Sequence, residues 1–201
     1  MATAACLLLG AVVLALSFTI EPGSIWFYPS AVALALVWVA GGLASWPLRA
    51  GHAPGLSTSA TAAVGLGLGL LLAGVFVLGA LVVRAIDPLA DQVASVLGYA
   101  TEGSLLALVA ITTVNGIGEE LFFRGTAFDA LSRRPVLWST LIYVAVTAAT
   151  GNIMLTFAAV LLGVLVGHER RITGGVLAPV LTHLAWSLTM LLALPPIFGL
   201  R

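Results

Sequence analysis

The sequence contains no lysine, so its eight basic residues are all arginine, and charged residues make up only 8% of its 201 positions. Soluble domains typically carry about 25% charged residues, so this scarcity excludes an ordinary water-soluble globule. The formal net charge is zero, which argues against binding nucleic acid through a basic surface. The single cysteine, Cys6, excludes an internal disulfide framework and a metal site built from thiolates.

Apolar residues are abundant instead, at 61% of the chain, and the mean hydropathy is +1.16. A helix needs roughly 20 apolar residues to cross a bilayer. Apolar runs of about that length, two of them shorter, occur at residues 3–20, 30–48, 60–83, 104–131, 136–150, 153–168 and 174–194. The sequence therefore predicts an all-α, polytopic membrane protein with about seven transmembrane helices.

Two segments have a more specific interpretation. The stretch 84–99 mixes acidic and apolar residues and begins a helix near Pro88, which predicts a helix lying in the interface plane. The third span carries five glycines, and small residues at such spacing permit close contact between helices. They are Gly65, Gly67, Gly69, Gly74 and Gly79.

The arginine distribution predicts an orientation. Loops after the second, fourth and sixth spans share one side and hold Arg49, Arg133, Arg134, Arg170 and Arg171. The opposite side holds Arg84 and Arg201 together with the acidic residues Glu21, Asp87, Asp91 and Glu102. Cytoplasmic loops carry an excess of basic residues, so we expect a cytoplasmic N-terminus. The dominance of Ala, Gly, Val and Leu is compatible with a GC-rich bacterial genome, so we expect the membrane to be a bacterial plasma membrane.

The fourth span carries the unusual motif Glu119-Glu120-x-x-x-Arg124. A charge near the bilayer centre costs about 2.5–3.5 kcal/mol, and such residues are usually functional. Glu120 and Arg124 are four residues apart and can pair on one helix face, whereas Glu119 points about 100° away. We therefore expect Arg124 to neutralise Glu120 and to leave Glu119 as the reactive group. The alternative is that all three residues only hold helices together.

Polar residues of two other spans fall at the depth of Glu119. At about 1.5 Å of rise per residue, Glu119, Thr147 and His183 all lie about 13–18 Å below the cytoplasmic surface. Ser187 is one helical turn after His183 and shares its face. This convergence predicts a buried polar site. The alternative for His183 is a simple hydrogen bond to a carbonyl of a neighbouring helix.

These motifs resemble the CAAX prenyl protease and bacteriocin-processing family, the intramembrane proteases also called Abi proteins. The similar residues are Glu119-Glu120-x-x-x-Arg124 and Gly174-Gly175-x-x-Ala-Pro-x-x-x-His183. The resemblance covers about residues 104–190, so it implies a family core at 104–194 after variable N-terminal helices and an interfacial segment at 1–103. It also implies roles for individual residues: Glu119 as the base that activates water, Glu120 and Arg124 as a supporting pair, and His183 as the group that polarises the carbonyl.

The sequence departs from this family at two positions. Tyr143-x-x-x-Thr147 stands where the family has Phe-x-x-x-His, and Ser187 stands where it has Asn or Asp. A serine hydroxyl can donate to an oxyanion, but threonine replaces imidazole neither as a base nor as a usual zinc ligand. A zinc ion is one account of the family's chemistry, yet here it would have to bind through Glu119, His183 and another group such as Glu120.

The first functional hypothesis is therefore an intramembrane endopeptidase whose glutamate activates water to cleave a peptide or membrane-protein substrate. The second is a catalytically inactive relative that binds or scaffolds another membrane protein, because Thr147 replaces a histidine. The third is a proton-coupled transporter, which the lack of any detectable inverted repeat disfavours. No feature of the sequence indicates that the protein recognises a prenyl group.

Overall fold

The computed structural model describes residues 2–43 and 47–200. Over these residues all regular structure is helical. The helices are α1 (Ala2–Ser17), α2 (Phe27–Leu43), α3 (Thr58–Val83), α4 (Asp87–Thr101), α5 (Leu105–Glu120), the π-helical segment η1 (Leu121–Ala127), α6 (Pro135–Ala148), α7 (Ile153–Thr173) and α8 (Leu177–Ile197). This confirms the all-α prediction. Residues 44–46 of the second expected span, and Arg201, lie outside the described residues.

The chain is an integral membrane protein. Among the described residues, four helices are long and apolar enough to cross a membrane: α3, α7, α8 and the continuous helix Leu105–Ala127 formed by α5 and η1. The shorter apolar helices are Thr3–Ser17, Phe27–Leu43 and Pro135–Ala148. Large apolar side chains such as Leu8 and Leu106 are exposed, 68% and 81% respectively, which suits contact with lipid. That all seven of these helices span the bilayer stays a prediction.

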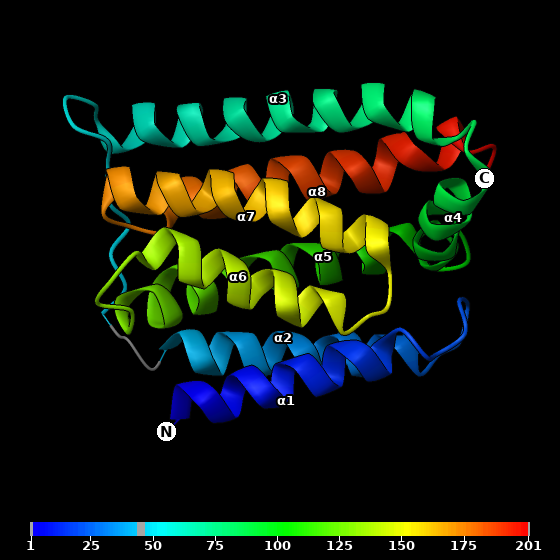
Figure 1. Ribbon diagram of the computed structural model, residues 1–201, viewed down its shortest axis with the longest axis horizontal. Helices are drawn as coiled ribbons and strands as arrows, with labels where there is room; N and C mark the ends of the chain where they lie inside the picture. Colours follow the sequence, from blue (N-terminus) through cyan, green and yellow to red (C-terminus); the bar gives the residue numbers. More distant parts are fainter. Residues whose placement is uncertain (1, 44–46, 201) are drawn as a thin grey trace.

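The long helices run side by side in one bundle (Figure 1). The α1–α2 hairpin forms one side, α3 lies on the opposite side against α8, and α5, α6 and α7 lie between them. The α2–α3 and α7–α8 connections lie at one end of the bundle, whereas α4 crosses the other end. The position of α4 fits the helix that the sequence predicts to lie in the interface plane, and Pro88 occupies its first turn.

Local sequence signals determine several helix ends. Ser57 and Asn152 cap α3 and α7 by accepting hydrogen bonds from Ala60 N (3.1 Å) and Leu155 N (2.9 Å). Gly174 ends α7 in the left-handed conformation, at φ 69°. The apolar pattern predicts the end of this span near residue 168, but the helix continues to Thr173. Residues 168–171 are thus helical, and some of their charged side chains turn inward.

An aromatic core joins α2, near the N-terminus, to η1 and α6. Trp38 of α2 contacts Phe122 and Phe123 of η1, with ring centroids 5.0 and 5.1 Å apart, and Phe123 contacts Tyr143 of α6 at 5.0 Å. Phe122 and Phe123 are 0% exposed and Trp38 is 1% exposed. These large rings anchor the segment that follows the acidic motif, and so they position the polar residues beside it.

Two glycines let α3 approach α8 closely. A Cβ added at Gly69 would lie 2.4 Å from the Thr182 carbonyl oxygen, and one at Gly65 would lie 2.9 Å from the Ala178 carbonyl oxygen. The other three glycines of the same helix have nothing within 4 Å of such an atom: Gly67, Gly74 and Gly79. The expectation of close contact is therefore confirmed for the two glycines on one face of α3.

Candidate active site

The acidic motif lies where an α-helix changes into a π-helix. Glu119 and Glu120 are the last two residues of α5, and Arg124 is in η1. π-Helical segments are rare and are frequent at functional sites. No local signal in the sequence distinguishes η1 from an ordinary helix, so the sequence does not predict this segment.

Glu120 is the centre of a buried polar cluster. It accepts from Arg124 Nη1 at 3.4 Å, and Arg124 Nε lies 3.4 Å from its second oxygen. His183 Nδ1 of α8 lies 2.8 Å from Glu120 Oε1. Glu120 and Arg124 are 0% exposed and His183 is 6% exposed. The ion pair predicted from the four-residue spacing is present, and His183 joins it as a second partner that spacing along one helix cannot reveal.

Arg124 is held by contacts from two further helices. Its Nη2 donates to the Gly163 carbonyl of α7 at 3.2 Å, and Thr140 Oγ1 of α6 donates to the same oxygen at 3.0 Å. Its guanidinium lies over the Tyr143 ring, 4.8 Å from the centroid. Arg170 Nε donates to the Arg124 main-chain carbonyl at 2.6 Å. The arginine is therefore held in place by α5, α6 and α7 together.

Glu119 differs from its neighbour in its surroundings. It is half-buried and makes no ion pair in the part of the chain that the structure describes. His183 and Tyr143 are near enough to influence its carboxylate electrostatically. Glu119 thus remains the acidic group that Arg124 does not hold, as the helical geometry indicates. In the sequence, Tyr143 stands out only through its motif position one turn before Thr147.

Two of the expected site residues form side-chain hydrogen bonds within their own helices. The Thr147 hydroxyl donates to the Tyr143 carbonyl of its own helix at 3.0 Å. The Ser187 hydroxyl donates to the Leu184 carbonyl at 3.4 Å, and Ser187 lines an apolar cavity of about 380 Å³. The structure brings together Glu119, Glu120, Arg124 and His183, while Thr147 and Ser187 bond to their own helices.

Asn115 lines the same apolar cavity. Its Nδ2 donates to the Ala31 and Ile111 carbonyls, both at 3.1 Å. The residue therefore ties α5 to α2, one helical turn before Glu119.

A second buried acid was missed altogether. Glu169 is only 6% exposed, and its Oε1 lies 2.7 Å from Thr182 Oγ1, the residue before His183. The same hydroxyl lies 2.8 Å from the Gly65 carbonyl of α3. The run Glu169-Arg170-Arg171 looks like a charged loop in the sequence. Nothing in that run separates the inward-facing acid from the exposed Arg171, so only helix packing reveals it.

The residues of the cluster do not fit a zinc ion. In the described ranges, no three His, Cys, Asp or Glu side chains are grouped so that they could hold a metal. Both Glu120 oxygens face Arg124 or His183, and His183 is the only imidazole of the cluster. Structural and catalytic zinc sites normally use several nitrogen or sulfur ligands. Zinc binding stays a prediction of the family resemblance that this donor set does not favour.

A carboxylate, guanidinium and imidazole buried together inside a bundle of apolar helices define a membrane protein with an intramembrane polar site. Residues 101–189 match the family model described as type II CAAX prenyl endopeptidase, Rce1-like. These residues are therefore similar to the Rce1-like CAAX endopeptidases, which are protease-type enzymes, and they include the motifs at Glu119 and His183. Residues 1–100 lie outside the match. No curated protein and no solved structure matches the chain.

Proposed function

We propose that this chain is an intramembrane endopeptidase in which Glu119 activates water for attack on a peptide bond. One observation carries the proposal: Arg124 and His183 both engage Glu120, and within residues 2–43 and 47–200 Glu119 forms no ion pair. The family match at residues 101–189 supports the reaction class. The substrate is a peptide or a membrane protein, because the site lies inside the helix bundle.

Glu120 supplies the orientation of the imidazole. A protonated imidazole donates through both nitrogens, so Nδ1–H holds the Glu120 carboxylate and Nε2–H remains for a substrate carbonyl oxygen. Gly116 leaves room beside that nitrogen, since a Cβ added there would lie 3.8 Å from His183 Nε2. The negative charge of Glu120 stabilises the imidazolium while Arg124 balances the carboxylate.

The reaction then needs only groups of this chain and water. Glu119 takes a proton from water, and the hydroxide oxygen bonds to the carbonyl carbon while His183 Nε2–H stabilises the oxyanion. The carbon–nitrogen bond breaks as Glu119 returns its proton to the leaving amine. Tyr143, which influences Glu119 electrostatically, helps to orient its carboxylate in this proposal.

The decisive test compares new peptide N-termini in membranes of cells that make the native protein or Glu119→Gln. The matched control is Glu21→Gln, an exposed glutamate between α1 and α2. We expect the termini to disappear with Glu119→Gln, with activity reduced at least about 10²-fold. They should persist with Glu21→Gln. Termini that persist at equal protein levels in Glu119→Gln would refute glutamate-dependent proteolysis.

The alternative function is that of a catalytically inactive relative that captures a membrane partner. It is favoured by Thr147, whose hydroxyl bonds to its own helix and puts no imidazole at this position. In that case Glu119→Gln would still retain the partner and complement a deletion strain. The native protein distinguishes the two functions, because only a protease yields peptide N-termini that depend on Glu119.

The bilayer is proposed to be a bacterial plasma membrane, with the N-terminus in the cytoplasm. The α2–α3 and α7–α8 connections lie at the same end as the start of α1 (Figure 1), and Arg49, Arg170 and Arg171 lie in or beside them. Single-cysteine variants in a Cys6→Ser background test this orientation with a membrane-impermeant maleimide on intact cells. Asp91→Cys should be labelled and Ser59→Cys should be protected. The reverse labelling would invert the topology.

A further inference from the structure

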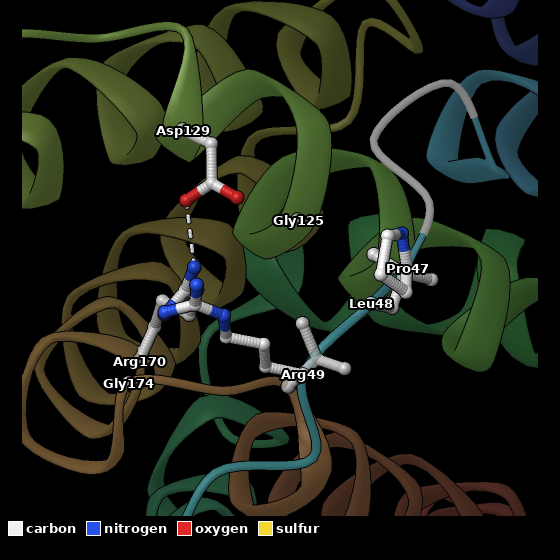
Figure 2. Close-up of a pocket in the computed structure, with 8 residues that line it drawn as sticks. Pro47, Leu48, Arg49, Gly125, Asp129, Arg170 and Gly174 are labelled. Carbon is white, nitrogen blue, oxygen red and sulfur yellow. Dashed lines mark hydrogen bonds and ion pairs between the residues drawn. The ribbon is translucent and has the colours of Figure 1, made fainter.

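A polar cavity of about 530 Å³ is lined by Arg49 and Arg170, and Figure 2 shows the residues around it. Glu119, Glu120, Arg124 and His183 are not among its lining residues. Its walls come from the α2–α3 connection, the end of η1, the end of α7 and the α7–α8 turn. Its volume falls within the roughly 300–1,000 Å³ typical of ligand pockets. Its lining residues are Pro47, Leu48, Arg49, Gly125, Asp129, Arg170, Gly174 and Val176.

The Arg170 side chain lines this cavity and is held in place by several contacts. Its Nη2 lies 2.6 Å from Asp129 Oδ1, and its Nε donates to the Arg124 carbonyl at 2.6 Å. Its guanidinium lies over the Phe128 ring, 5.2 Å from the centroid. These contacts use two of the five N–H groups of a guanidinium, so donors remain for a ligand.

Arg49 reaches the same place from another part of the chain. Figure 2 shows its side chain extending toward Arg170 and Asp129. Its backbone is held by the α7–α8 turn, because Val176 N donates to the Arg49 carbonyl at 2.9 Å. Gly175 permits this contact, because a Cβ at Gly175 would lie 2.1 Å from the carbonyl oxygen of Ala50, the residue after Arg49. These contacts therefore fix the backbone of Arg49 beside the cavity.

The charges of the cavity do not balance. Two arginines face a single aspartate, and Arg49 has no carboxylate within ion-pair distance in residues 2–43 and 47–200. One positive charge is therefore left for an anion. Guanidinium groups bind phosphate oxygens through paired N–H donors, and basic pockets between membrane helices at the cytoplasmic side bind lipid head groups.

We propose that this cavity, lined by Arg49, Arg170 and Asp129, is a binding site for a phosphate group, supplied by an anionic phospholipid or by a soluble phosphate. Asp129 orients Arg170 from one side, and the ligand phosphate lies between the two guanidinium groups on the other side. Because Arg170 also holds the Arg124 carbonyl, the bound ligand stabilises the end of η1 and hence the arginine that pairs with Glu120.

The test measures binding of short-chain phosphatidylglycerol to the purified full chain by native mass spectrometry, with short-chain phosphatidylcholine as the neutral lipid. Inorganic phosphate is added in a separate arm. Arg49→Ala is compared with Arg171→Ala, an exposed arginine at the same end of α7 that does not line the cavity. We expect Arg49→Ala to weaken binding about tenfold and Arg171→Ala to change it less than about twofold.

The arms separate the two sources. Arg49-dependent binding of phosphatidylglycerol that inorganic phosphate does not displace supports a lipid head group. Arg49-dependent binding of inorganic phosphate alone supports a soluble ligand. Equal binding by Arg49→Ala and Arg171→Ala, or equal binding of both lipids, would overturn the proposal. The proposal would also be overturned if a peptide carboxylate bound through Arg49 and neither phosphatidylglycerol nor inorganic phosphate did.

Discussion

Among the single residues of the site, Glu120 has a larger role than its sequence position indicates. The spacing of the motif assigns it to Arg124, but its Oε1 also lies 2.8 Å from His183 Nδ1. Both contacts are buried, where an unpaired charge is costly. The carboxylate therefore joins α5, η1 and α8, and it holds Nδ1 of the imidazole.

Glu120→Gln tests this role. The amide keeps the shape of the side chain but loses the charge that balances Arg124 and His183. We expect cleavage to fall by about 10²-fold or more, because the imidazole loses its orienting charge. Breaking a buried pair also costs about 3–5 kcal/mol of stability. Cleavage assays and thermal unfolding of the purified protein measure the two effects. Native values for both would show that Glu120 does not organise the site.

Glu169 and Thr182 provide a second prediction about individual side chains. The Thr182 hydroxyl has one proton but lies 2.7 Å from Glu169 Oε1 and 2.8 Å from the Gly65 carbonyl. A neutral, protonated Glu169 resolves this, since it donates to Thr182 while Thr182 donates to Gly65. Glu169→Gln should then preserve stability, because an amide also donates. Glu169→Ala should cost about 1–3 kcal/mol in thermal unfolding. Equal losses in both variants would contradict a neutral Glu169.

Between whole helices, the contact of α3 with α8 depends on particular glycines. Gly69→Ala places a methyl group 2.4 Å from the Thr182 carbonyl oxygen, so the helices must separate. We expect a loss of about 1–3 kcal/mol in stability, measured by thermal unfolding. The matched control is Gly67→Ala, two residues away and exposed, which should be neutral or stabilising by up to about 1 kcal/mol. A native melting temperature for Gly69→Ala would refute the close packing.

Across the whole molecule, the N-terminal helices help to build the site although the family match begins at residue 101. Trp38 of α2 packs on the phenylalanines of η1, and Gly65 of α3 accepts from Thr182. We therefore expect residues 104–201 produced alone to be degraded in the membrane, which a chase of protein levels measures. Co-production of residues 1–103 should restore the fragment. A stable, active fragment alone would show that the N-terminal helices are dispensable.

The class of protein and the pairing inside the acidic motif follow from the linear sequence. Apolar runs and scarce charge define a helical membrane protein, and the four-residue spacing pairs Glu120 with Arg124, because both depend on residues close together in the chain. Glu119 and His183 stand out for a related reason, as rare polar residues inside apolar spans.

The contacts between different helices are determined only by the tertiary structure. Packing joins His183 to Glu120, turns Glu169 inward and leaves Thr147 and Ser187 bonded to their own helices. The rotation of each helix about its axis follows from packing between segments far apart in sequence, which the spacing along one helix does not encode.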